Sequence, residues 1–248
     1  MTPTSRTRWA LAIETSNPSS SPTGESSGPS VAIAPLQSVQ GRHRLSSPST
    51  VERLRTPVAR EDDLLPAIER LTRSQGVGAK DIGLVAVSTG PGGFTALRVS
   101  VTVAKLIAYS GGGVCVGVPS ACVAAERARA SGRFAVLLAS KSDSAFATVF
   151  EPGWNRGEDV LHPPQGRLVT AATLSDLGIT QIVADSHLVP AIRARAEHLG
   201  VPVVPPHWDA GACLELALRL APVTPDELLP LYPREAEAVT LWKKRHGG

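Results

Sequence analysis

The chain has 248 residues, of which 42% are hydrophobic, 19% are charged and only 4% are aromatic. This composition predicts one large or two small packed α/β domains with an aliphatic core, and it excludes an extended disordered protein. The net charge of +3 is too small to indicate a nucleic-acid-binding protein by itself. The three cysteines follow no paired or C-x-x-C pattern, and no apolar run reaches the roughly 20 residues of a membrane span, so we expect a cytoplasmic protein without disulfides.

The first half of the chain predicts an α/β lobe that begins with a strand hairpin. Apolar runs at residues 9–13 and 30–34 flank a stretch rich in Ser, Pro and Gly, and a weaker strand is expected at 42–46. The elements expected next are a helix at 62–75, a strand at 82–88, a helix at 95–109, a strand at 114–118 and a helix at 120–130. Proline is tolerated in the first turn of a helix, so Pro66 places the start of the first helix near residue 62.

The second half repeats this order of elements without repeating the sequence. It begins with a hairpin of strands at residues 134–139 and 145–150. The elements that follow are a strand near 167–169, a short helix at 171–177, strands at 181–184 and 201–204, and helices at 189–199 and 210–220. We therefore predict two similar lobes, residues 1–131 and 132–248, each with a mixed sheet and flanking helices.

A glycine-rich turn at residues 90–93 (GPGG) joins a strand to the longest predicted helix. Backbone N–H groups at such a turn, together with the positive end of the helix, can bind a phosphate or carboxylate; the candidate groups are Gly92, Gly93 and Thr95. The pattern is neither the G-x-G-x-x-G nor the P-loop fingerprint. The alternative is that the glycines only allow a tight strand-to-helix turn.

The helix at residues 95–109 is more apolar than an ordinary surface helix, which needs an apolar face of about 100°. Its polar residues lie on one stripe, Arg98, Thr102, Lys105 and Tyr109. A stripe of small residues would let a second helix approach closely, namely Ser100, Ala104 and Ala108. Either the helix at 62–75 of the same chain covers the excess apolar surface, or both helices form a face for another subunit.

The sequence offers no clear catalytic constellation. The six histidines are scattered and form no H-x-x-x-H pair, which argues against a zinc protease. Asp185, Ser186 and His187 are adjacent, but adjacency in sequence does not place a nucleophile within reach of its base, and no G-x-S-x-G elbow is present. The acids at residues 61–63 are more simply explained as a helix start than as metal ligands.

Several stretches resemble the TsaB (YeaZ) family, and they occur in the family's order. They are residues 11–16 (LAIETS), 64–68 (LLPAI), 87–99 (VSTGPGGFTALRV), 103–105 (VAK), 116–120 (VGVPS) and 230–234 (PLYPR). The glycine motif is the most specific of these, and the others support it by their order.

The resemblance implies the two-lobed fold of actin, sugar kinases and heat-shock ATPases. It also implies a non-catalytic activating subunit that binds the transferase TsaD, with the ATPase TsaE as third member. In that family the complex places threonylcarbamoyl on the adenosine beside the anticodon of tRNA, which this chain would contact only indirectly. No metal and no cofactor of its own is expected, and ATP or ADP at a partner interface stays open.

In this family two N-terminal helices form the heterodimer face, and on this chain they would be the helices at 62–75 and 95–109. Arg98, Thr102 and Lys105 are then the expected polar contacts. The residues expected at the apolar centre of the face are Leu64, Leu65, Ile68, Ala104 and Ala108. The same helices could also pair two copies of this chain as a homodimer.

The chain departs from the family's pattern at four places. Glu14 stands where the family usually has Asp, and the loop at residues 17–29 is longer than usual; both bear on nucleotide binding. Residues 60–62 (RED) and 139–141 (ASK) replace a His-Ser-Glu and an Asp-Ala-Arg run, which bears on partner contacts. The alternative functions are a glycoprotease-type peptidase and a stand-alone, nucleotide-binding, kinase-like enzyme.

Overall fold

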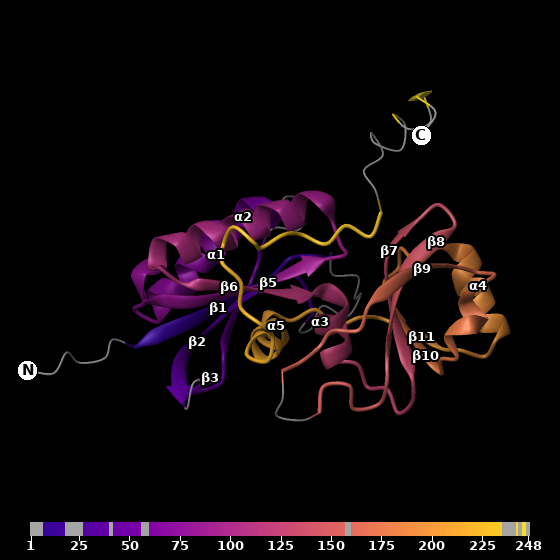
Figure 1. The fold of residues 1–248 in the computed structure, drawn as a ribbon, viewed down its shortest axis with the longest axis horizontal. Helices are drawn as coiled ribbons and strands as arrows, with labels where there is room; N and C mark the ends of the chain where they lie inside the picture. Colours follow the sequence, from indigo (N-terminus) through magenta and orange to yellow (C-terminus); the bar gives the residue numbers. More distant parts are fainter. Residues whose placement is uncertain are drawn as a thin grey trace, which may run out of the picture.

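The structure is a computed structural model that describes residues 7–17, 27–39, 42–55, 60–156, 160–234, 242 and 245–246. It has two α/β lobes, one at each end of the long axis in Figure 1. Most of the unusually long loop at 17–29, and the side chains of residues 60–62, lie outside what is described. Two of the four departures from the family's pattern are therefore described only in part.

The first lobe is built on a mixed sheet. Its strands are β1 (Arg8–Glu14), β2 (Ser30–Val39), β3 (Arg42–Leu45), β4 (Thr50–Arg53), β5 (Ile82–Gly90) and β6 (Val114–Pro119). The strand order is β3-β2-β1-β5-β6, and β4 also pairs with β2. β1 is antiparallel to β2 and parallel to β5, which is parallel to β6. The predicted hairpin and the strands after it are confirmed, whereas β4 was not predicted.

The second lobe repeats this topology. Its strands are β7 (Phe134–Lys141), β8 (Ser144–Phe150), β9 (Gly166–Thr170), β10 (Gln181–Ala184) and β11 (Val203–Val204), in the order β11-β10-β7-β8-β9. β7 is antiparallel to β8 and parallel to β10, which is parallel to β11. Each strand of the first sheet except β4 thus has a counterpart with the same pairing sense. The prediction of two mixed sheets built from a repeated order of elements is confirmed.

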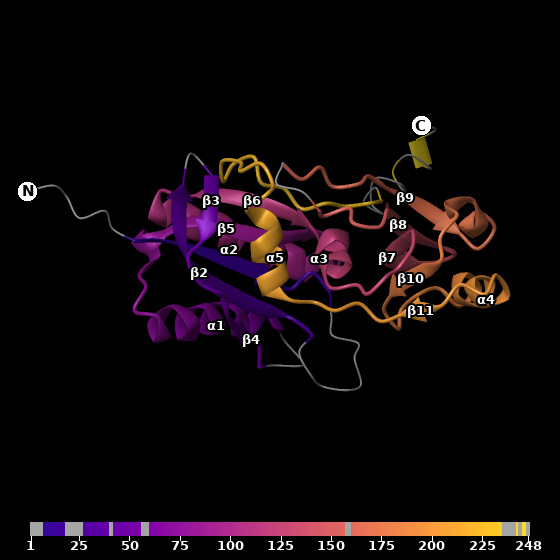
Figure 2. The same ribbon diagram turned by 90° about the horizontal axis from the view of Figure 1, so that it is seen from below.

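The helices and sheets stack in layers along the molecule (Figures 1 and 2). The helices are α1 (Arg60–Ser74), α2 (Phe94–Gly111), α3 (Ser120–Glu126), α4 (Pro190–His198) and α5 (Ala210–Ala217), and two short 3-10 helices are η1 (Ala79–Asp81) and η2 (Leu174–Leu177). α1 and α2 cover the outer face of the first sheet, and α3 and α5 lie between the sheets. α4 and η2 cover the outer face of the second sheet.

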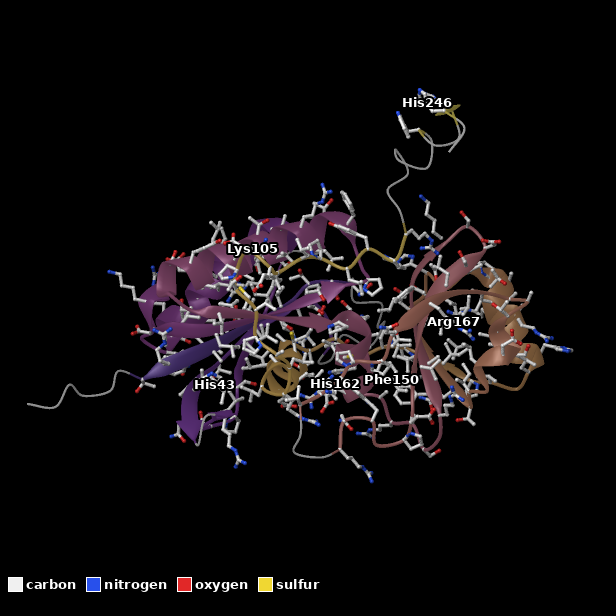
Figure 3. The ribbon with its side chains drawn as sticks, viewed as in Figure 1. His43, Lys105, Phe150, His162, Arg167 and His246 are labelled. Atoms are coloured by element: carbon white, nitrogen blue, oxygen red, sulfur yellow. The ribbon has the colours of Figure 1, made fainter. Side chains whose placement is uncertain are left out.

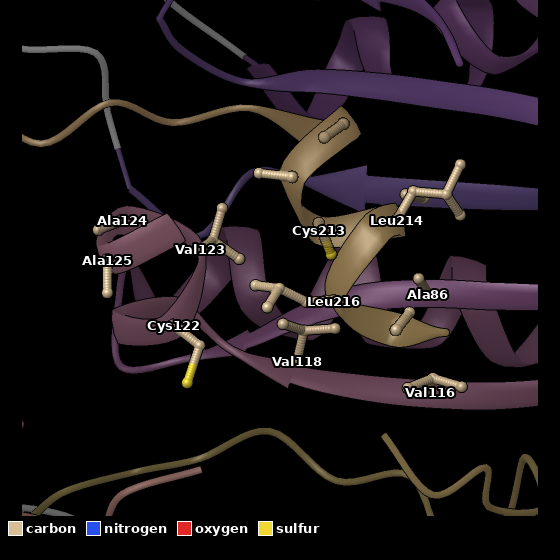
Figure 4. Packing of buried hydrophobic residues seen from close by; sticks show 14 of the residues in the cluster. Ala86, Val116, Val118, Cys122, Val123, Ala124, Ala125, Cys213, Leu214 and Leu216 are labelled. Carbon is tan, nitrogen blue, oxygen red and sulfur yellow. The ribbon is translucent and has the colours of Figure 1, made fainter. Parts of the chain in front are cut away.

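The contacts of β1 explain why the sequence of this strand is a continuous apolar run. Alternate residues of a strand face opposite sides of the sheet. Leu11 and Ile13 pack under α1 and α2, whereas Ala10 and Ala12 face the layer of α3 and α5. Both faces are therefore buried, as expected for strands covered on two sides. Figure 4 shows the layer of α3 and α5 against the sheet, with Val116 and Val118 beneath them.

Helix α5 differs from the sequence-based expectation in its surroundings. It was predicted as part of the second lobe, but it packs on β1 and β2 of the first sheet and against α3. The small side chains of Ala10, Ala12 and Ala32 leave room for this close approach. The chain therefore returns to the first lobe after β11, and the predicted division into residues 1–131 and 132–248 does not describe which elements pack together.

Several helix predictions differ in detail; α3, for example, ends at Glu126 rather than at residue 130. α1 begins at Arg60, so Pro66 lies in its second turn rather than its first. Because Pro66 is exposed and Leu64 and Ala67 are buried beneath the helix, packing of the inner face outweighs the hydrogen bond lost at the proline. The predicted helix at 171–177 is only the 3-10 helix η2. Within the described residues, no helix is both long and apolar enough to span a membrane.

Candidate partner-binding face

The glycine turn before α2 is shaped by contact with the end of β1. The N–H of Gly93 donates a hydrogen bond of 2.7 Å to the carbonyl oxygen of Ser16. A Cβ on Gly92 would lie 2.7 Å from the Ser16 carbonyl carbon and still closer to its oxygen. Glycine at position 92 therefore lets the turn approach the backbone just beyond β1, a tertiary contact that differs from the tight strand-to-helix turn expected from the sequence.

At the same turn, one of the three groups predicted to bind an anion, the Gly93 N–H, already has a hydrogen-bond partner. Gly92 is half-buried, and Gly93 and Thr95 are exposed at the N-terminus of α2. The Gly93 N–H already has a carbonyl partner, so it is not free for a phosphate or carboxylate. Anion binding by Gly92 and Thr95 stays a prediction.

Behind the turn lies a buried carboxyl group, Glu14, at the end of β1. It is fully buried, and its Oε1 accepts hydrogen bonds from the Ser16 N–H (2.9 Å) and hydroxyl (2.6 Å). Oε2 has no hydrogen-bond partner among the described residues. Burial raises the pKa of Glu14 above its ordinary value of 4.5, and the bonds from Ser16 offset only part of this.

This burial predicts a pH-dependent contribution to stability. In the unfolded chain Glu14 loses its proton near pH 4.5, whereas the folded protein keeps the proton to a higher pH. The stability that Glu14 contributes to the folded protein is fully present below pH 4.5, and it is lost as the pH rises through the pKa of Glu14 in the folded state. Glu14→Gln cannot ionise, so its stability relative to wild type should increase with pH in urea unfolding from pH 4.5 to 8. A stability difference between Glu14→Gln and wild type that stays flat over this pH range would contradict this account.

The small-residue stripe of α2 faces the sheet, not a partner. The hydroxyl of Ser100 contacts that of Thr15 just beyond β1 and also donates to the Ala96 carbonyl, and Ala104 and Ala108 are fully buried. Leu64 and Ile68 of α1 are buried in the same core. The lobe's own atoms therefore cover four of the residues predicted for the apolar centre of a partner face, and the prediction is corrected for them: Leu64, Ile68, Ala104 and Ala108.

A C-terminal segment supplies a cover for α2 that the sequence did not predict. We call residues 223–234 the strap; in Figure 1 it runs along α2 toward the second lobe. Val223 forms a bridge with Cys115 on the edge strand β6, and Leu228 is buried in the core under α1 and α2. Leu231 donates its N–H to the carbonyl of Thr89 at 2.7 Å. The strap and α1 together cover part of the excess apolar surface of α2.

Two of the four residues of the predicted polar stripe on α2 are held by the strap. Arg98 donates from Nε to the Tyr232 hydroxyl at 3.1 Å, and its guanidinium carbon lies 3.8 Å from the centre of the Phe94 ring. The Tyr109 hydroxyl donates to a carboxylate oxygen of Asp226. The other two, Thr102 and the labelled Lys105 in Figure 3, make no hydrogen bond or ion pair with another described residue.

Even with these covers, large apolar side chains stay exposed on the outer helices. Leu65 on α1 and Leu106 on α2 are each 60% exposed, and Phe94 and Tyr109 are each 54% exposed. Thr102 is also exposed and Lys105 is half-buried. Of the residues predicted for the apolar centre, Leu65 alone is accessible, and Leu106 and Phe94 were missed although both lie in the predicted helix or next to it. We call the exposed side of α1 and α2 the outer helix face.

The groups weighed as catalytic do not come together. His43, His162 and His246 lie far apart in Figure 3. His187 donates its backbone N–H to the Asp185 side chain at 2.9 Å, and among the described residues no hydrogen bond joins the Ser186 hydroxyl to the His187 imidazole. The described part of the chain contains no group of three or more His, Cys, Asp or Glu that could hold a metal ion.

Comparison with known proteins places this geometry in a structural class. A crystal structure of an uncharacterized Pseudomonas aeruginosa protein with similarity to the peptidase YeaZ superposes with a TM-score of 0.63 at 18% identity, covering 92% of this chain and 100% of that one. YeaZ from Pseudomonas aeruginosa superposes with a TM-score of 0.60 at 18% identity, covering 91% and 99%. The chain thus has the two-lobed, actin-like fold of the YeaZ structures.

A protein-family model also matches part of the sequence. The family model described as "TsaD: tRNA N6-adenosine threonylcarbamoyltransferase" matches residues 59–152, which include α1 and α2. No curated protein matches the chain. Together, the TsaD-family segment and the YeaZ-like fold support a TsaB/YeaZ-like protein.

Proposed function

We propose that this chain is a non-catalytic subunit that binds and activates a TsaD-type transferase in the threonylcarbamoyl modification of tRNA. The partner is expected to dock on the outer helix face, and a TsaE-type ATPase is the expected third member. The single observation that carries the proposal is the exposed apolar surface of α1 and α2, at Leu65, Leu106 and Phe94, within the segment that matches the TsaD family.

The location of this surface supports a protein partner. A contiguous apolar surface rimmed by polar residues is typical of an interaction site, and we propose that Leu65, Leu106 and Phe94 belong to one such surface. Thr102 and Lys105 supply such groups on the same helix. Because this chain and TsaD share a family segment that contains both helices, two such helix pairs could pack across a pseudo-twofold axis. The same geometry would let two copies of this chain form a homodimer in the partner's absence.

The chemistry of the site favours an accessory role over catalysis. One structural neighbour is described by similarity to a peptidase, but in this chain the adjacent Asp185, Ser186 and His187 form an exposed turn. At the glycine turn, the Gly93 N–H is occupied by Ser16, and the Glu14 carboxyl is buried. We therefore expect no nucleotide-dependent reaction from the isolated chain, with ATP or ADP bound only at the interface with its partner.

A reconstituted modification assay tests this function. The TsaD-type and TsaE-type proteins of the same organism, with tRNA, ATP and a threonylcarbamoyl donor, should modify tRNA only slowly until this chain is added. Adding it should increase the rate at least tenfold, the size of effect expected when binding shifts a protein to its active state by about 1.4 kcal/mol. No stimulation, or peptide cleavage by the purified chain that a single substitution abolishes, would contradict the proposal.

A further inference from the structure

The last part of the strap, residues 231–234, connects the two lobes. Beyond the peptide links between α3 and β7 and between β11 and α5, it is another place where the chain joins one lobe to the other. Figure 1 shows it leaving the N-terminal end of α2 and reaching β7. Its two ends make specific contacts of different kinds.

The first end is fixed to the outer helix face. Leu231 is hydrogen-bonded to Thr89 at 2.7 Å, and a Cβ on Gly90 would lie 2.8 Å from the Leu231 carbonyl oxygen. The ring of Tyr232 lies 5.4 Å from that of Phe94, and its hydroxyl accepts from Arg98. Phe94, Arg98 and Tyr232 are all exposed, so a molecule docking on the N-terminal end of α2 would contact the same side chains that hold Tyr232.

The second end is fixed to the hairpin between β7 and β8. Arg234 donates to the carbonyl oxygen of Ala139 and, through Nη2, to the carbonyl (3.0 Å) and hydroxyl (3.1 Å) of Ser144. Hydrogen bonds from a guanidinium are stronger than those between neutral groups. Ala139 has a φ of +51°, a conformation that non-glycine residues adopt at a cost, and its carbonyl is one of the groups that Arg234 holds.

The two ends are close enough in sequence to move together. Tyr232 and Arg234 are separated only by Pro233, whose ring fixes one backbone angle. Only one residue therefore separates the two side chains, which leaves little chain to absorb a shift of Tyr232 before it reaches Arg234. At Ala139 the hairpin backbone has a conformation that costs energy, and the carbonyl of this residue accepts a hydrogen bond from Arg234.

We propose that residues 231–234 are a latch that transmits the state of the outer helix face to the β7–β8 hairpin of the second lobe. Closed, the latch holds the hairpin through Arg234; displacement of Tyr232 from Phe94 and Arg98 releases it. The part of this inference that concerns a partner rests on the proposed function, whereas the latch itself is a property of the isolated chain.

Hydrogen–deuterium exchange on the full chain tests the latch. Arg234→Ala should increase exchange of amides in residues 139–144 about tenfold, because several hydrogen bonds to the hairpin are lost. Tyr232→Ala, at the far end, should increase exchange at the same amides. Arg133→Ala, which removes an exposed ion pair with Glu151 in the same lobe, should leave them unchanged. Circular dichroism confirms that each variant is folded.

The outcomes separate the latch from a local clamp. If Arg234→Ala leaves exchange at 139–144 unchanged, the latch is wrong. If Arg234→Ala increases it but Tyr232→Ala does not, Arg234 holds the hairpin locally and nothing is transmitted. Adding the TsaD-type partner should change exchange at 139–144 in the wild type and not in Arg234→Ala. If the partner binds but exchange at 139–144 does not change, transmission from the outer helix face to the hairpin is contradicted. If the partner does not bind, the proposed function is contradicted, and the results for Arg234→Ala and Tyr232→Ala alone decide whether the latch exists.

Discussion

Replacing Gly92 by alanine should destabilise the protein by about 3 kcal/mol or more, at the upper end of what overpacking costs. The added methyl group would overlap the carbonyl of Ser16, which is backbone and cannot rotate away. To make room, the turn before α2 would have to separate from the end of β1 and lose the hydrogen bond between Gly93 and Ser16. Urea unfolding followed by circular dichroism measures the change.

The neighbouring glycine provides the matched control. Gly93 has a φ of −63°, and a Cβ there would come no closer than 3.8 Å to Ala96 or Ser16, which is an ordinary contact. Gly93→Ala should therefore change the free energy of unfolding by no more than about 1 kcal/mol, the cost of placing alanine at the N-cap of α2. Equal effects of the two substitutions would show that the close approach of the turn to Ser16 is not what requires glycine.

Leu106→Arg should weaken binding to the TsaD-type partner about 30-fold or more, the loss of about 2 kcal/mol typical of an interface hot spot. Leu106 is 60% exposed on α2, so an arginine there is solvated in the free chain but would be buried without a counter-charge in the complex. Isothermal titration calorimetry with the purified partner measures the affinity. Ala104→Arg is unsuitable for this purpose because Ala104 is fully buried and the variant would disrupt the lobe itself.

Leu168→Arg controls for the added charge. Leu168 lies on β9 of the second lobe and is 46% exposed, so the same substitution there leaves the outer helix face intact. Its affinity for the partner should match that of wild type, and both variants should unfold at nearly the wild-type temperature. A comparable loss of affinity in both variants would remove the outer helix face as the docking site.

The parts of the fold that could be predicted from sequence are those governed by local pattern. The apolar runs of β1 and β5, the glycine turn and the helical periodicity of α2 each carry a short-range signal. The C-terminal strap carries none, because residues 223–234 have no period and contain prolines. Its contacts, such as that between Leu231 and Thr89, join parts of the chain far apart in sequence. The return of α5 to the first lobe is of the same kind.

The two helices of the candidate site were predicted from the sequence, but the apolar side chains that they expose were not. Composition showed correctly that α2 is more apolar than one covered face requires, yet it could not show which of several small or apolar residues faces the sheet. Ala104 and Ala108 permit close approach of the sheet as well as of a partner helix, and the sheet occupies that space. Leu65 and Leu106 are among the apolar residues that the sheet does not cover and that stay exposed.

Hydrogen–deuterium exchange of this chain with and without the TsaD-type protein tests the central claim most directly. Docking on the outer helix face predicts slower exchange in peptides from α1 (Arg60–Ser74) and α2 (Phe94–Gly111), and unchanged exchange in α4 (Pro190–His198) on the far side of the second lobe. Protection confined to the second lobe, or no protection at saturating partner concentration, would contradict the account.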